Sequence, residues 1–104
     1  MLEVIIEIIR YVDDAQPGWV ECQLTDAWGH QHIFRDKVPI FTSSDLTSSS
    51  IYPQEGRTAC LEVCRLRDKQ GREIVTIDTE NPWRVESLLG ETRFDVLAEQ
   101  LAGQ

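Results

Sequence analysis

Residues 19–36, with the sequence WVECQLTDAWGHQHIFRD, contain the clearest structural pattern in the chain. Apolar side chains alternate with polar ones over the first part of this stretch, at Val20, Cys22 and Leu24. A period of two residues is typical of a β-strand that buries one face. The next four residues, Asp26-Ala27-Trp28-Gly29, begin with aspartate and end with glycine, as tight turns often do. We therefore expect residues 19–36 to form an antiparallel β-hairpin.

The pattern Cys-x-Leu-x-Asp-x-x-Gly in this stretch recurs 42 residues later, over residues 64–71. A tight turn closed by a left-handed glycine sets the same register in both hairpins. It places Glu21 opposite Arg35 in the first hairpin. In the second it places Leu66 opposite Ile74, so pairs of opposite charge or shared apolarity meet across the strands. The sequence leaves open whether the two hairpins are a duplication or independent uses of one turn.

The rest of the chain adds strands and one predicted helix. Residues 2–12 are rich in β-branched side chains, which favours a strand. Residues 42–56 are predicted to be a long Ser/Thr-rich surface loop. Phe94 and Leu101 belong to an apolar helical period that predicts a C-terminal α-helix over about residues 92–102. The expected fold is mainly β: a small antiparallel barrel of five or six strands, built of hairpins, with that helix covering one end.

The composition fits a single domain over residues 1–104. The chain has 18 acidic and 10 basic residues, a formal net charge of −8. This balance disfavours nucleic acids and anionic membranes as partners, because both attract Lys and Arg. We find neither an apolar run of the ~20 residues that a membrane-spanning helix needs nor a secretory leader. We therefore expect a cytoplasmic protein.

The charge is unevenly distributed along the chain. Residues 57–72 carry five basic residues against two acidic ones, a net of +3. Residues 1–34 and residues 73–104 each have a net charge of −5. Acidic surfaces of this kind steer basic partners toward them, so the predicted protein partner is a basic one.

Cysteine and histidine are the only residues that suggest a metal site. Cys22, Cys60 and Cys64 are an odd number of thiols, so we expect free cysteines rather than a disulfide framework. His30 and His32 are two apart on one strand, and Cys22 on the partner strand shares the face of His32. A zinc site needs three or four ligands, and no fourth ligand is identifiable. We predict no metal and no cofactor, and the weak candidates for an alternative, metal-binding hairpin are Cys22, His30 and His32.

The sequence contains no recognisable set of nucleophile, base and acid. The nucleophile elbow of hydrolases is absent, as are phosphate-binding loops and dinucleotide fingerprints. We therefore predict no catalytic residues and a non-enzymatic protein.

Aromatic residues give the best indication of function. Trp19, Trp28 and Trp83 lie in or beside predicted turns, and Tyr52 lies in the long loop. Large aromatic residues often anchor protein interfaces. We predict a protein-binding or accessory module whose partner-binding residues are Trp28, Trp19, Tyr52 and Asp26. One version is a small inhibitor or immunity-type protein for a basic partner, and an alternative is a small-ligand sensor or carrier that uses the barrel interior.

Overall fold

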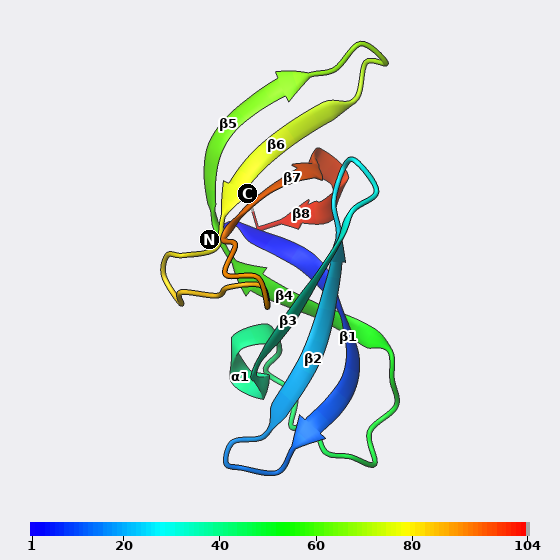
Figure 1. The fold of residues 1–104 in the computed structure, drawn as a ribbon, viewed down its shortest axis with the longest axis vertical. Coiled ribbons are helices and arrows are strands. Elements are labelled where there is room, and N and C mark those ends of the chain that lie inside the picture. The colour runs from blue at the N-terminus through cyan, green and yellow to red at the C-terminus, as the bar shows by residue number, and fades with distance from the viewer. Residues whose placement is uncertain (104) are drawn as a thin grey trace.

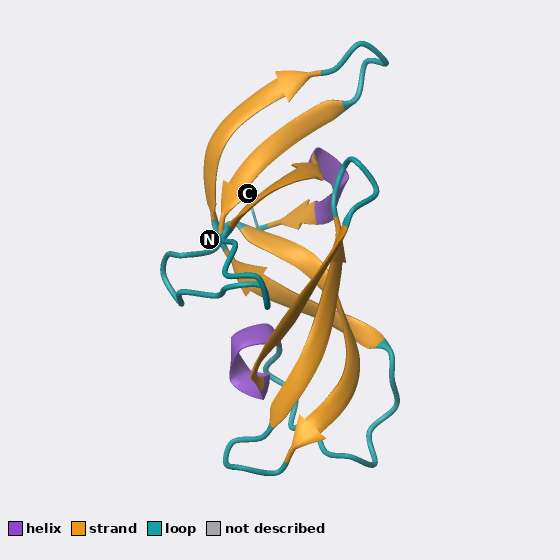
Figure 2. Cartoon of the chain, viewed as in Figure 1, coloured by secondary structure: helices purple, strands orange, loops and turns teal. Residues whose placement is uncertain are grey.

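A computed structural model describes residues 1–103, and its strands form two antiparallel sheets (Figure 1). The first sheet has the order β3-β2-β1-β4, with the short β8 also paired to β1, and the second has the order β5-β6-β7. The strands are β1 (Glu3–Asp13), β2 (Trp19–Thr25), β3 (Gln31–Lys37), β4 (Gln54–Ala59), β5 (Leu61–Arg67), β6 (Glu73–Asp78), β7 (Arg93–Leu97) and β8 (Leu101–Ala102). Within the described part of the chain, helix is limited to α1 (Val38–Phe41) and the 3-10 turn η1 (Ala98–Gln100) (Figure 2).

The predicted register is confirmed for the first hairpin and, in the second, for the residues next to the turn; the predicted pairing of Val63 with Ile77 is wrong, because a bulge between Glu62 and Cys64 places Glu62 opposite Ile77. In β2–β3, Glu21 lies opposite Arg35, whose Nε donates a hydrogen bond of 2.9 Å to Glu21 Oε1. In β5–β6, Leu66 lies opposite Ile74. The first hairpin belongs to one sheet and the second to the other, so the two occurrences of the pattern pack in different surroundings.

The two hairpin turns also share their geometry. In each, the carboxylate of the first residue accepts the backbone N–H of the residue four positions later, at 2.9 Å for Asp26 and 2.8 Å for Asp68. Gly29 and Gly71 follow with φ of 84° and 80°, a region in which a Cβ would be strained. The demands of this turn account for the aspartate and the glycine of the recurring pattern, whatever the origin of the two hairpins.

One hydrophobic core joins the two sheets. It combines alternate residues of β1 and β2 with Val75 and Ile77 of β6. Phe34 of β3 and Phe94 of β7 meet edge to face, with 5.5 Å between their ring centroids. The chain passes from β4 in one sheet to β5 in the other at Cys60. The sheets are therefore linked by both the core and the backbone.

The predicted closed barrel is wrong. Among residues 1–103 the strands form two sheets, and no closed barrel is found. Alternation along a strand shows which face is buried, but it does not show whether the outer strands of two sheets pair with each other. The mainly β, antiparallel character is confirmed.

The predicted C-terminal helix over residues 92–102 is also wrong. This stretch forms β7, η1 and β8 instead. Phe94 and Val96 are buried, and Val96 lies opposite Val75 of β6. Pairing with β6 buries these alternating residues, and this tertiary interaction outweighs the helical period. The four-residue α1 lies earlier, with Pro39 in its first turn.

Two connections in the chain are long. Residues 42–53 join α1 to β4 and overlap the Ser/Thr-rich loop predicted at 42–56. Residues 79–92 join β6 to β7. None of the helices described within residues 1–103 has the length and apolar character needed to cross a membrane.

Candidate protein-binding surface

The connection of residues 79–92 is held to the body of the protein at its base. Thr79 and Val85 are fully buried, and Thr79 Oγ1 donates a hydrogen bond of 2.6 Å to Val85 O. The Val85 N–H donates in return to Thr79 O at 3.0 Å. The Thr79 N–H donates to Thr92 O at 2.8 Å and closes the base. The connection therefore has a fixed path although it contains no helix or strand.

The far end of this connection is a tight turn. Ser87 Oγ accepts the N–H groups of Leu89 and Glu91, at 3.3 and 3.1 Å. The Leu88 N–H donates to Ile33 O of β3 at 2.8 Å. Hydrogen bonds from within the turn therefore order it, and a further backbone hydrogen bond connects it to the first sheet.

This ordered connection presents large apolar side chains to solvent. The exposed fractions are 57% for Trp83, 56% for Leu88 and 87% for Leu89. Turn positions usually carry Gly, Pro, Asn, Asp or Ser, each of which suits the turn backbone. Two consecutive leucines there expose apolar area to water, which is unfavourable for the chain alone. We refer to Trp83, Leu88 and Leu89 as the loop patch.

The same connection carries an acidic rim. Glu80, Glu86 and Glu91 are exposed carboxylates, and the basic residue between them in sequence is Arg84. Glu91 Oε1 lies 3.6 Å from His32 Nδ1 of β3. Three carboxylates against one guanidinium give this region a net negative charge. Such a rim favours a partner with basic residues around its apolar docking site.

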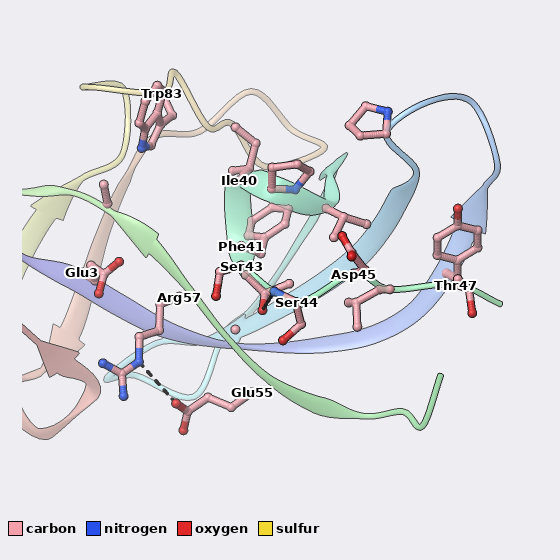
Figure 3. Close-up of a pocket in the computed structure, with 18 of the residues that line it drawn as sticks. Glu3, Ile40, Phe41, Ser43, Ser44, Asp45, Thr47, Glu55, Arg57 and Trp83 are labelled. Atoms are coloured by element: carbon pink, nitrogen blue, oxygen red, sulfur yellow. Dashed lines mark hydrogen bonds and ion pairs between the residues drawn. The ribbon is translucent and has the colours of Figure 1, made fainter. Parts of the chain in front are cut away.

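A surface groove lies beside Trp83 (Figure 3). It has a volume of about 910 Å³ and lies between α1, the residues that follow α1, and β4. Its carboxylates are Glu3, Asp45 and Glu55, and Arg57 Nε bonds to Glu55 Oε2 at 3.3 Å. The groove thus extends the acidic surface next to Trp83.

Trp28 and Asp26 lie in the β2–β3 turn, where internal contacts hold both. The Trp28 indole N–H donates a hydrogen bond of 3.0 Å to Asp95 Oδ2, and the Arg72 guanidinium lies 5.6 Å from the ring centroid. Trp28 still exposes 48% of its surface. Asp26 is largely buried, and its Oδ2 lies 2.8 Å from His32 Nε2. Burial acts to raise the pKa of Asp26, but hydrogen bonds from His32 and the turn backbone outweigh it and lower the pKa.

Trp19 and Tyr52 lie away from that turn. Trp19 pairs with Lys37, at the end of the β2–β3 hairpin opposite the turn (Figure 1). Tyr52 Oη donates a hydrogen bond of 2.7 Å to Thr47 O within residues 42–53. The structure therefore does not bring the four predicted partner-binding residues together on one surface.

The three metal candidates do not converge. Cys22 is fully buried opposite Phe34, and this burial raises the pKa of its thiol. The His30 side chain is 74% exposed. In the part of the chain that the structure describes, no group of three or more His, Cys, Asp and Glu side chains is arranged to hold a metal ion.

The leucines of the loop patch are missing from the residues predicted from sequence. Trp83 is recognisable beside a turn, but Leu88 and Leu89 have no motif around them. The signal that was available is a pair of leucines directly before Gly90, in a stretch otherwise rich in turn residues.

No protein-family model matches the chain, and neither does a curated protein sequence or a solved structure. The function proposed below therefore rests on the surface geometry and charge described above.

Proposed function

We propose that this protein is a non-enzymatic module that binds a basic protein partner through the loop patch. The observation that carries the proposal is the exposure of Trp83, Leu88 and Leu89 on a connection whose path is fixed by hydrogen bonds. A preordered loop loses less conformational freedom on binding, so more of the contact free energy appears as affinity. Trp is among the residues most often found at the energetic centre of interfaces.

The charge of the molecule supports a basic partner. The chain has a net charge of −8, and Glu80, Glu86 and Glu91 belong to the same connection as the loop patch. Long-range attraction speeds association, whereas burial of apolar anchors slows dissociation. One concrete form of this function is an inhibitor or immunity-type protein that covers a basic surface of another protein.

The thiols support an intracellular setting for this module. Cys22, Cys60 and Cys64 are free, and Cys64 is exposed. Exposed free thiols persist best in a reducing compartment, which is the basis for placing the protein in the cytoplasm. The proposed function requires no cofactor.

The test compares partner capture by three forms of the full chain. These are the wild type, the double variant Leu88→Ser with Leu89→Ser, and the control Ile51→Ser. Ile51 is 85% exposed, close to the 87% of Leu89, but it lies in the connection of residues 42–53. Each form is immobilised in lysate of the source cells, and bound proteins are quantified by mass spectrometry. We expect the double variant to lose a discrete partner by about tenfold or more, whereas Ile51→Ser retains it.

Equal capture by the wild type and the double variant would reject the loop patch as the binding surface. With a captured partner in hand, Glu80→Gln combined with Glu86→Gln tests the acidic rim. Surface plasmon resonance at low and raised salt should show slower association and nearly unchanged dissociation. Unchanged association rates would remove the argument for a basic partner.

A further inference from the structure

Strand β5 is an uncovered sheet edge, and we propose that it is a second interface, which takes an extended acidic segment of a protein partner by strand addition. β5 ends the order β5-β6-β7, so one of its sides has no strand neighbour within residues 1–103. All seven of its residues are exposed. In strand addition the incoming segment pairs its backbone with such an edge, and its alternate side chains contact the residues on it. This surface is separate from the loop patch, and neither proposal depends on the other.

The two strands of this hairpin differ in burial. Val75 and Ile77 of β6 are fully buried, whereas Leu61, Val63 and Leu66 of β5 expose 53, 43 and 50%. The hairpin forms one end of the molecule along its longest axis, which measures 44 Å against 26 and 24 Å for the others (Figure 1). Three aliphatic side chains on a projecting edge strand expose apolar area that only a partner would cover.

Edge strands are usually protected by bulges or charged side chains. β5 has a bulge and charged side chains, but each of them protects only part of the strand. The bulge is confined to the segment between Glu62 and Cys64. Arg65 is bonded within the hairpin, through Nη2 to Glu62 Oε1 at 2.7 Å and through Nη1 to Glu73 Oε1 at 2.5 Å. Beyond the bulge β5 keeps a regular ladder with β6, a geometry that an added strand can extend.

Two cations near the turn of the hairpin select the occupant. Residues 61–78 carry four basic and four acidic residues, so the hairpin as a whole is neutral. Arg65 and Arg72 are bonded to carboxylates of the hairpin, whereas no ion pair of Arg67 or Lys69 is found among the described residues. An extended segment with alternating acidic residues would meet Arg67 and Lys69 with opposite charge. Its intervening apolar residues would cover Leu66.

The test measures the binding of short peptides to the full chain. One eight-residue probe alternates glutamate and valine, and a second alternates lysine and valine. Two further forms of the glutamate probe are N-methylated at every second residue, in opposite phases. We expect the glutamate probe to shift the amide NMR signals of residues 61–67, more strongly at low salt, and the lysine probe to leave them unchanged. Only one N-methylated phase should bind, because a single edge of the peptide pairs with β5.

Matched variants separate this surface from the loop patch. Leu61→Ser with Leu66→Ser should weaken binding of the glutamate probe about tenfold, whereas Leu88→Ser with Leu89→Ser should leave it unchanged. Thermal unfolding of each variant checks that the fold is intact. The proposal is overturned if the lysine probe binds as well, if both N-methylated phases bind, or if shifts occur only in residues 79–92. Self-association with protection of residues 61–67 before any peptide is added would also overturn it, by assigning the edge to a second copy.

Discussion

The indole N–H of Trp28 donates a hydrogen bond of 3.0 Å to Asp95 Oδ2, and this bond joins the β2–β3 turn of the first sheet to β7 of the second. The other oxygen of the same carboxylate, Oδ1, accepts Thr76 Oγ1 at 2.6 Å. The backbone N–H of Ala27 donates to Asp95 O at 2.8 Å. Two bonds thus hold the turn against the second sheet, and the bond from Thr76 of β6 fixes the Asp95 carboxylate within that sheet.

Trp28→Phe tests the first of these bonds, because it keeps a ring and removes the N–H. We expect the free energy of unfolding to fall by about 1 kcal/mol, the usual range for one hydrogen bond at a partly exposed site. Chemical denaturation measures the change. In a double-mutant cycle with Asp95→Asn, the effect of Trp28→Phe should shrink once the carboxylate is gone. Strictly additive effects would show that the bond contributes nothing to stability.

Asp26 predicts a loss of stability in acid. Hydrogen bonds from His32 and the turn backbone hold the folded-state pKa of Asp26 below its ordinary value. Such a group stabilises the fold fully above its unfolded pKa of about 4, and this contribution is lost as the pH falls through the folded pKa. We expect the free energy of unfolding to decrease below about pH 4, and Asp26→Asn to reduce that decrease. Urea denaturation at neutral and acidic pH measures both.

The pH dependence will be reduced in that variant rather than abolished. Hydrogen bonds donated by arginines or by backbone N–H groups also lower the pKa values of Glu21, Asp68 and Asp78. Asp45→Asn is the control, because this carboxylate is exposed in the connection of residues 42–53. If Asp26→Asn and Asp45→Asn change the loss of stability below about pH 4 equally, the contact between Asp26 and His32 does not cause that loss.

Two buried threonines give opposite predictions. Thr58 is 1% exposed, and its Oγ1 has no hydrogen-bond partner among the described residues. Thr79 is fully buried, and its Oγ1 donates to Val85 O at 2.6 Å. Valine replaces the hydroxyl by a methyl of similar shape, so Thr58→Val should raise the melting temperature by about 4–8 °C and Thr79→Val should lower it comparably. Calorimetry measures the melting temperature of each variant. A lower melting temperature for Thr58→Val than for the wild type would contradict the prediction.

The hairpins were predictable because their information is local. Asp26 and Gly29 specify one turn within four residues, and the turn sets the register of the strands beside it. Residues 92–102 were not predictable in the same way, since Phe94 fits both a helical and an alternating pattern. The choice depends on β6, whose Val75 lies opposite Val96 although the two residues are 21 positions apart in sequence. Closure of a barrel likewise depends on contacts that no single strand encodes.

The sequence predicts the type of candidate site, a surface with exposed aromatic residues, but not which residues form it. Tryptophans at turns indicate a binding surface. The sequence cannot show which of these tryptophans are held in place by hydrogen bonds within the protein. Trp28 donates to Asp95, a residue 67 positions away. The Trp83 indole makes no such hydrogen bond within the described residues, and Trp83 belongs to the loop patch. Leu88 and Leu89 become notable only when their exposure is known.

Leu88→Ser with Leu89→Ser separates a binding role of the loop patch from a structural one. The two side chains are 56 and 87% exposed, and the bonds that order the turn involve their backbone N–H groups. We therefore expect the free energy of unfolding to change by less than about 0.5 kcal/mol, as for other exposed substitutions. Val85→Ala is the control, because Val85 is fully buried in the same connection, and it should cost about 2 kcal/mol. Denaturation of both variants makes the comparison. A loss in the leucine variant as large as that of Val85→Ala would make the leucines part of the fold, and their exposure would no longer argue for a partner.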